Sequence, residues 1–311
     1  MSVPNADPED HERTSLEVDI GVELGGTKVV VAASDGGRAL RGRVQIPTGA
    51  PEPTLDAVRR AIEDLAGTDA TPAIGIGSFG PIDLRGDSPT FGTILSTPKP
   101  QWSGVDVING IAGDSGHPVG LDTDVAAALR AEHRWGAAAT RTAAYATVGT
   151  GVGVALWLDG QIVQGLNHSE IGHIRVPRHE EDTFAGVCPY HGDCLEGMAS
   201  GPAIAARWGA PAERLPADIW RTARDLEAWY LAHGIAGMCA VVPVETVVIG
   251  GGVAQMEGLH RAVTDGLAEA SGLYPPIPFA EGGPRIVRPG LGNDAGVLGS
   301  IELARIARAS I

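Results

Sequence analysis

Apolar residues follow two patterns along the chain, and these patterns predict alternating strands and helices. Strand-like runs, alternating or rich in β-branched residues, cover residues 16–24, 27–34, 73–80, 142–158, 246–251 and 284–289. Helix-like, Ala-rich segments lie between or after them, at residues 54–67, 124–136, 223–242 and 293–309. Strands mixed with helices in this way favour an α/β protein.

Two of the strand-like runs share one motif. ELGGTKVVVAA (residues 23–33) and TVGTGVGVALW (residues 147–157) each predict a strand, a Gly/Thr-rich turn and a second strand. Two similar hairpins about half a chain apart indicate a duplicated architecture with a cleft between the halves. Gly-rich turns also leave backbone N–H groups free to face phosphate oxygens. Either turn taken alone is more simply a plain β-hairpin. A third glycine-rich turn, GGGV at residues 250–253, follows a further strand-like run and adds support to the phosphate-binding interpretation.

The composition narrows the classes of function. The 311 residues are 43% hydrophobic, which suits one large domain or two ordinary ones. The formal net charge of −15 opposes binding to nucleic acid or to anionic lipid. No apolar run reaches the about 18 residues that span a bilayer, so no membrane partner is expected. The polar residues 1–17 predict a disordered tail rather than a signal peptide.

Cysteine usage indicates the compartment. The chain has three cysteines, an odd number, and no export signal, which together point to a reducing cytoplasm. Paired cysteines in that compartment are more often metal ligands or redox groups than structural disulfides.

Asp124 lies where a strand is expected to end and an Ala-rich helix to begin, in GLDTDVAAALRAE. Asp is a good helix N-cap, which gives a purely structural interpretation. A carboxylate at the carboxyl end of a strand can instead accept a proton from a substrate hydroxyl during phosphoryl transfer. Asp122, two residues earlier in the strand, projects the same way, and spacing alone does not separate the two.

A second group of reactive side chains follows the pattern His173-x14-Cys188-x2-His191-x2-Cys194. Four such ligands match a closed tetrahedral zinc site, and a closed site has no open position for water, so the metal is expected to be structural. The alternative is a chance cluster of a surface histidine and two free thiols, and His179 competes as the fourth ligand.

Two carboxylates lie next to these expected zinc ligands along the chain. Glu170 precedes His173 by three residues, and Glu196 follows Cys194 by two. A metal that fixes the ligands also fixes these neighbours. Carboxylates held in this way suit the vicinal hydroxyls of a sugar, which they bind as paired acceptors.

These motifs together resemble the ROK sugar kinases, which have the actin/hexokinase-like (ribonuclease H-like) fold, and among them the bacterial fructokinases most closely. The resemblance extends from about residue 18 onward. It depends on these segments, in this order: GVELGGTK, GIGSFGPIDL, FGTILSTPKPQW, LDTDVAAAL, TVGTGVG, GLNHSEIGHIRVPRH, CPYHGDCLEGMASGPAI and IGGGV. It implies a duplicated two-domain α/β fold with an interdomain cleft, a homodimer, and ATP-dependent phosphorylation of D-fructose to fructose 6-phosphate.

The resemblance also implies a division of the chain. Residues 18–122, with a C-terminal helix at about 296–311, are expected to form a smaller α/β domain that carries the first phosphate-binding turn. Residues 123–295 are expected to form a larger α/β domain with the catalytic Asp, the zinc-binding loop and the second turn.

Residue roles follow from the matched motifs. Asp124 is implied as the general base, with Glu170, His173 and Glu196 holding the sugar. Gly80 and Pro81 are implied to line the sugar pocket, over which the STPKPQW loop closes. The residues implied to meet the ATP phosphates are Thr27, Lys28, Thr150 and Gly151, and those that border the adenosine are Gly251 and Gly252. Magnesium is expected to arrive with ATP rather than in a protein cage.

Three positions depart from the family pattern. Many members have Asp where this chain has Glu23, others have Asn where Ala126 stands, and His191 replaces a common cysteine. The change at Ala126 leaves glucose, mannose or an N-acetyl hexosamine open as the substrate. A sugar-sensing repressor is a different class, but the residues before the first strand are too few for a helix-turn-helix. A sugar-binding protein without catalysis is a further alternative, against which the retained Asp124 argues.

Overall fold

The computed structural model describes residues 17–67, 71–272 and 283–310. Its contacts divide the chain into two compact units, one running to Ala131 and resuming at Asp294, the other spanning Glu132–Asn293. Apart from Glu17, the predicted disordered tail lies outside the described residues. The predicted division after residue 122 falls at the start of helix α3 (Asp124–Trp135), whereas the contacts divide the chain inside that helix.

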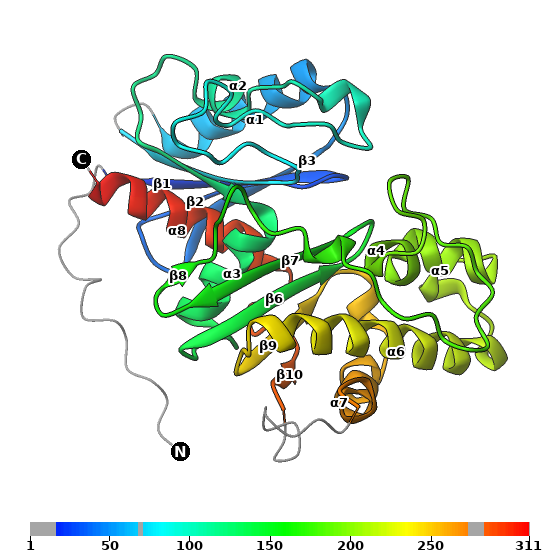
Figure 1. The fold of residues 1–311 in the computed structure, drawn as a ribbon. Coiled ribbons are helices and arrows are strands. Elements are labelled where there is room, and N and C mark those ends of the chain that lie inside the picture. Colours follow the sequence, from blue (N-terminus) through cyan, green and yellow to red (C-terminus); the bar gives the residue numbers. More distant parts are fainter. Residues whose placement is uncertain (1–16, 68–70, 273–282, 311) are drawn as a thin grey trace. The chain divides into compact units, whose positions relative to one another are not determined.

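The first unit is built on a five-stranded mixed sheet (Figure 1). Its strands, in spatial order, are β3 (Leu40–Pro47), β2 (Lys28–Ser34), β1 (Asp19–Leu24), β4 (Ala73–Ser78) and β5 (Val119–Thr123). The first three form an antiparallel meander, and β4 and β5 run parallel to β1. The register pairs Leu24 with Ser78 and Ser78 with Thr123, so the carboxyl ends of three strands meet at one edge.

Helices cover both faces of this sheet. Helices α1 (Pro51–Ala66) and α2 (Val107–Ala112) lie on one face, and α8 (Ala295–Ala309) lies on the other (Figure 1). Alternate residues of β1 enter the core beneath α1 because strand side chains alternate between faces. On the α8 face the strands carry glycine in register at Gly21, Gly75 and Gly120. A Cβ at any of them would lie 1.8–2.6 Å from a backbone oxygen of α8, so glycine permits the close packing of this helix.

The second unit repeats the same topology. Its strands, in spatial order, are β10 (Arg285–Val287), β9 (Thr246–Gly250), β6 (Thr142–Val148), β7 (Val152–Leu158) and β8 (Gln161–Ile162). Here β6, β7 and β8 form the antiparallel meander, and β9 and β10 extend it in parallel beside β6. The strand order therefore matches that of the first unit, which confirms the predicted duplicated α/β architecture.

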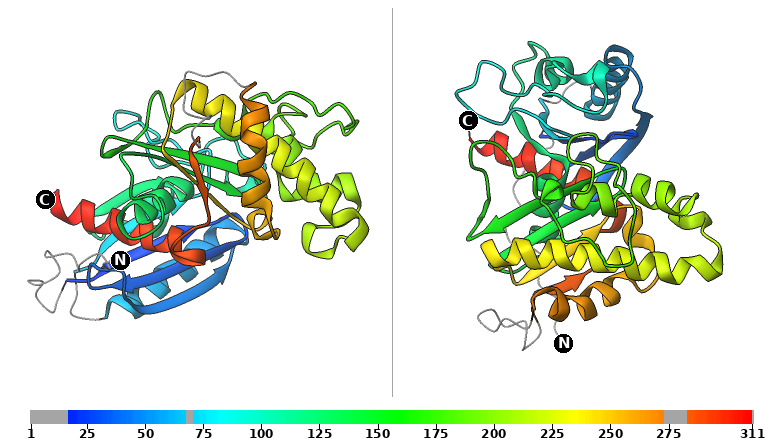
Figure 2. Two further views of the ribbon diagram at one scale, coloured as in Figure 1. Left: turned by 90° about the horizontal axis from the view of Figure 1, so that it is seen from below. Right: turned by 45° about the vertical axis from the view of Figure 1, so that its right-hand side comes forward.

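Two helices pack together over one face of the second sheet. Figure 2 shows α6 (Ala217–Val241) beside α7 (Leu259–Ala270). The core between sheet and helices includes Val148 and Ile249 from the strands and Leu231, Ile235 and Val263 from the helices. Two short helices, α4 (Leu195–Ala199) and α5 (Gly201–Trp208), follow the irregular segment that carries the two cysteines of CPYHGDC.

Every strand and helix segment expected from the sequence contains an element of that type. The apolar patterns do not predict the remaining elements, which are β3, β8, α2, α4, α5 and α7. Strand β3 alternates half-buried and exposed positions, but its polar residues interrupt the apolar alternation from which a strand is predicted. Among the described helices, none combines the length and apolar character needed to cross a bilayer.

Candidate active site

Asp124 begins α3 directly after β5, as expected. The capping hydrogen bond of this helix comes from the preceding residue, because Thr123 Oγ1 accepts the N–H of Ala126 at 3.2 Å. Asp124 Oδ1 accepts the N–H of its neighbour Val125 at 2.8 Å. The interpretation of Asp124 as the helix N-cap is therefore wrong, and Thr123 has that role.

The structure also separates Asp122 from Asp124. The Asp122 side chain is 1% exposed and lies 3.1 Å from the guanidinium of Arg130. Its other oxygen accepts the N–H of Thr123 at 2.9 Å. A buried carboxylate in an ion pair with further hydrogen bonds is a structural group. Asp124 is a partly exposed residue, whereas Asp122 is buried.

The surroundings of Asp124 suit a proton acceptor. Burial, together with the negative charge of Glu23, raises the pKa of Asp124 to about 7. Burial also raises the pKa of Glu23 itself, which the charges of Lys28 and Arg43 oppose. A general base with a pKa near the working pH combines an ionised form with useful basicity.

Three of the predicted sugar and phosphate segments meet at the edge where β1, β4 and β5 end. Gly80 and Pro81, joined by a cis peptide bond, follow β4. The Pro81 carbonyl accepts the N–H of Leu95, which connects this segment to the STPKPQW loop. A Cβ at Gly26, in the first glycine-rich turn, would lie 3.3 Å from Lys99 Cε of that loop. Sequence patterns did not single out Lys99, since only the fold brings it to this turn.

The four predicted metal ligands form a cluster in the second unit. One ligand atom from each of His173, Cys188, His191 and Cys194 lies within 4.8 Å of the others. His173 Nδ1 is 3.6 Å from Cys188 Sγ and 3.5 Å from Cys194 Sγ. Tetrahedral zinc with ordinary Zn–S and Zn–N bonds separates a sulfur from a nitrogen ligand by about 3.5 Å. The donor set and its spacing therefore fit zinc.

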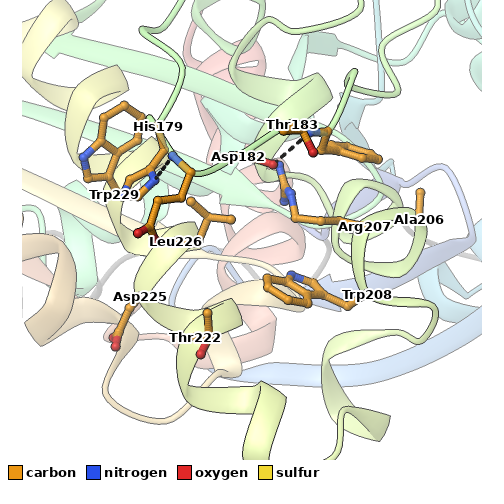
Figure 3. Close-up of a pocket in the computed structure, with 12 residues that line it drawn as sticks. His179, Asp182, Thr183, Ala206, Arg207, Trp208, Thr222, Asp225, Leu226 and Trp229 are labelled. Atoms are coloured by element: carbon orange, nitrogen blue, oxygen red, sulfur yellow. Dashed lines mark hydrogen bonds and ion pairs between the residues drawn. The ribbon is translucent and has the colours of Figure 1, made fainter.

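His179, the competing fourth ligand, is not in this cluster. Its Nδ1 accepts the N–H of Glu181 at 3.3 Å, and its ring packs edge-on against Trp229. It lines a pocket of about 650 Å³ together with Arg207 and Trp208 (Figure 3). Apart from His179, none of the residues predicted for sugar, nucleotide or metal binding is among those that line this pocket.

The free edge of His173 faces two carboxylates. Its Nε2 lies 3.9 Å from Glu170 Oε2 and 4.0 Å from Glu196 Oε1. The cluster thus places the three residues predicted to hold the sugar around one imidazole nitrogen, which points away from the thiols.

The second glycine-rich turn lies next to these residues. It connects β6 to β7 through Gly149, Thr150 and Gly151. The turn after β9 approaches it, since a Cβ at Gly149 would lie 3.9 Å from the N of Gly252. Gly251 has a φ of 89°, and a Cβ there would lie 2.3 Å from the Val148 carbonyl oxygen, so only glycine fits. The fold therefore brings together the two turns predicted to bind nucleotide in this unit.

Comparison with known proteins decides the family. The sequence model of the family described as the ROK family matches residues 19–307. This chain belongs to the ROK family. The ROK protein is 40% identical over 292 residues to a fructokinase from Zymomonas mobilis, covering 92% of this chain and 96% of that one. It is 37% identical over 294 residues to a putative fructokinase from Bacillus subtilis, covering 92% and 95%.

A solved structure gives the fold of this ROK protein independent support. A ROK family glucokinase from Streptomyces griseus, in complex with glucose and AMPPNP, superposes with a TM-score of 0.71 at 25% identity, covering 93% of this chain and 99% of that chain. The likeness, together with the repeated sheet topology, confirms the predicted actin/hexokinase-like fold.

Proposed function

We propose that this protein is an ATP-dependent hexose kinase that converts D-fructose to fructose 6-phosphate. The observation that carries the proposal is Asp124, a partly exposed residue directly after β5 whose pKa is raised to about 7. The similarity to fructokinases along nearly the whole chain supports fructose as the sugar. The glucokinase complex with AMPPNP supports ATP as the donor and keeps glucose as the first alternative sugar.

In the proposed reaction Asp124 takes the proton of the 6-hydroxyl as that oxygen attacks the γ-phosphorus and ADP leaves. Glu170 and Glu196 accept hydrogen bonds from the other hydroxyls, and the His173 ring donates to one of them. Gly80 and Pro81 shape the sugar pocket. Correct placement accounts for much of the rate, because phosphoryl transfer needs little covalent help from the protein.

The residues proposed for nucleotide binding belong to three turns. Thr27 and Lys28 follow the first turn, and the exposed Lys28 supplies a cation for the phosphates. Thr150 and Gly151 offer backbone N–H groups from the second turn, and Gly251 and Gly252 border the adenosine. Mg²⁺ bound to ATP would neutralise the charge that develops on the phosphates.

We also propose that His173, Cys188, His191 and Cys194 hold one structural Zn²⁺. The support is the donor set and its sulfur–nitrogen distances of 3.6 and 3.5 Å, which are close to those around tetrahedral zinc. When bound, the ion fixes the ring of His173 and with it the surroundings of Glu170 and Glu196. A homodimer is proposed from the family resemblance, and light scattering of the purified protein tests it.

An ADP-release assay with a panel of hexoses and Mg-ATP tests the proposed function. We expect turnover of fructose with a higher kcat/KM than for glucose, mannose or N-acetyl hexosamines. A preference for another sugar would change the substrate and leave the reaction in place. No ADP release with any hexose, from protein that is folded and loaded with zinc, would contradict the proposal.

A further inference from the structure

One carboxylate oxygen of Glu196 accepts a hydrogen bond from the protein backbone. Its Oε2 accepts the N–H of Val152 at 3.0 Å. Val152 is the first residue of β7 and directly follows the second glycine-rich turn. A Cβ at Gly151 would lie only 2.6 Å from Glu196 Oε2, so the carboxylate packs directly against the turn. The two residues are 44 positions apart in sequence, and this contact depends on the fold.

The backbone that carries Glu196 is held from several sides. It lies in the short helix α4, whose first residue, Leu195, donates its N–H to the carbonyl of Ile174 at 3.0 Å. At the other end Arg207 donates to the Met198 carbonyl at 3.0 Å. The Glu196 side chain is 21% exposed. A carboxylate on so fixed a helix can hold the turn in one position.

The other oxygen points toward the proposed sugar-binding group. Glu196 Oε1 lies 4.0 Å from His173 Nε2, beside Glu170. At this distance the oxygen is not hydrogen-bonded to the ring, and it stays available to a substrate hydroxyl. The two oxygens of one carboxylate therefore serve two different neighbours.

We propose that Glu196 positions the second phosphate turn through Val152 and thereby couples sugar binding to nucleotide binding. The inference rests on the proposed function, which assigns sugar to Oε1 and phosphates to the turn. A sugar hydroxyl on Oε1 restricts the carboxylate, and a restricted carboxylate holds the Val152 N–H and the turn before it. The turn is then in place when the phosphates arrive. Coupling of this kind is reciprocal, so nucleotide must also tighten sugar binding.

Three variants distinguish positioning of the turn by Glu196 from an effect of its negative charge and from a contact with sugar alone. Glu196→Gln keeps an oxygen that can accept the Val152 N–H but removes the charge. Glu196→Ala removes both, and the Gln variant is its matched control. Glu196→Asp keeps the charge, but its side chain is one methylene too short to reach Val152. The dissociation constant of a non-hydrolysable ATP analogue with Mg²⁺ is measured for each by calorimetry, with and without fructose.

Without sugar, we expect the analogue to bind the Ala variant roughly tenfold more weakly than the Gln variant, since the lost contact is one partly buried hydrogen bond. The Asp variant should resemble Ala despite its charge. Fructose should tighten analogue binding to the wild type and to Gln but not to Ala. Equal sugar-free constants for Gln and Ala, in proteins with matching Tm, would overturn the inference.

Failure of the proposed function would look different. If the wild type binds the analogue but turns over no hexose, the assigned reaction is wrong. The sugar-free comparison of the Gln and Ala variants would still decide whether Glu196 positions the turn. If Glu196 contacts only sugar, kcat and the KM for sugar change in these variants while the sugar-free constants for the analogue stay equal.

Discussion

The carboxylate of Glu23 lies near enough to Asp124 for its negative charge to raise the Asp124 pKa. Glu23 lies in β1 and Asp124 directly follows β5, and these two strands flank β4 in the sheet. The Glu23 carboxyl packs against the first turn of α8, since a Cβ at Gly296 would lie 2.5 Å from its carboxyl carbon. Its position, and so its influence on Asp124, is fixed by that helix.

Activity should therefore rise with pH. Asp124 must be ionised to accept a proton, and its pKa is about 7, so kcat/KM should increase through about pH 7 and level off above it. Glu23→Gln removes a negative charge that disfavours ionisation, and the midpoint should move to lower pH. Glu52→Gln, an exposed change in α1, is the control and should leave the midpoint in place. A pH–rate profile that Glu23→Gln leaves unshifted would contradict this electrostatic link.

Lys99 should contribute to nucleotide binding. Its side chain lies against Gly26 of the first turn, where a cation would attract phosphate oxygens. Lys99→Met should raise the KM for ATP about tenfold and change the KM for sugar much less, whereas Lys99→Arg should retain most of the affinity. Steady-state kinetics with each substrate varied in turn measures both constants. A change confined to the KM for sugar would assign Lys99 to the sugar instead.

The purified protein should contain about one zinc ion per chain. Cys194→Ser or His191→Ala should lose most of it and lower the Tm, because a structural zinc contributes directly to folding. Cys239→Ser is the matched control, since this third cysteine is buried in α6 and is not part of the cluster. Elemental analysis of protein prepared without chelators decides the question. Absence of zinc, or equal loss in the Cys239 variant, would count against the site.

Glu227 should make stability depend on pH. It is 1% exposed, neither carboxylate oxygen has a hydrogen-bond partner among the described residues, and burial raises its pKa well above the ordinary value of 4.5. The folded state therefore keeps a proton that the unfolded state releases, and stability falls as pH rises above about 4.5 toward the folded pKa.

Glu227→Gln stays neutral and should avoid that loss. Its Tm should exceed that of the wild type by a few degrees at pH 8 and match it near pH 4.5. Glu257→Gln, an exposed change, should alter the Tm at neither pH. Calorimetric melting at the two pH values measures the difference. A Gln variant less stable than the wild type at pH 8 would show that the carboxylate is ionised and satisfied in the fold.

The sequence was sufficient where the signal is local. Alternating or β-branched runs predicted β1, β2, β6 and β9. The spacing of thiols and imidazoles predicted that His173, Cys188, His191 and Cys194 come together, because they lie in one loop and the turn before it. Distant contacts were not predictable in this way. The spacing of Asp122 and Asp124 is the same in either role, and what separates them is the ion pair of Asp122 with Arg130.

A different reason applies to the contact between Glu196 and Val152. No pattern in either segment indicates it, because it forms only when α4 packs beside the turn between β6 and β7. Lys99 likewise reaches Gly26 only through the path of its loop. The predicted N-cap of α3 was off by one residue. Thr123, which forms the cap, directly precedes Asp124, and threonine is also a cap-forming residue.

Asp124 is proposed to accept the proton of the sugar hydroxyl, and the kcat of Asp124→Asn at saturating fructose and ATP tests this role. The amide is nearly the same size, and Thr123 continues to cap α3, so the Tm should be unchanged and fructose should still bind. Loss of a general base should lower kcat by about 10²–10⁴-fold. A kcat equal to that of the wild type, with the Tm unchanged, would contradict the assignment of Asp124 as the base.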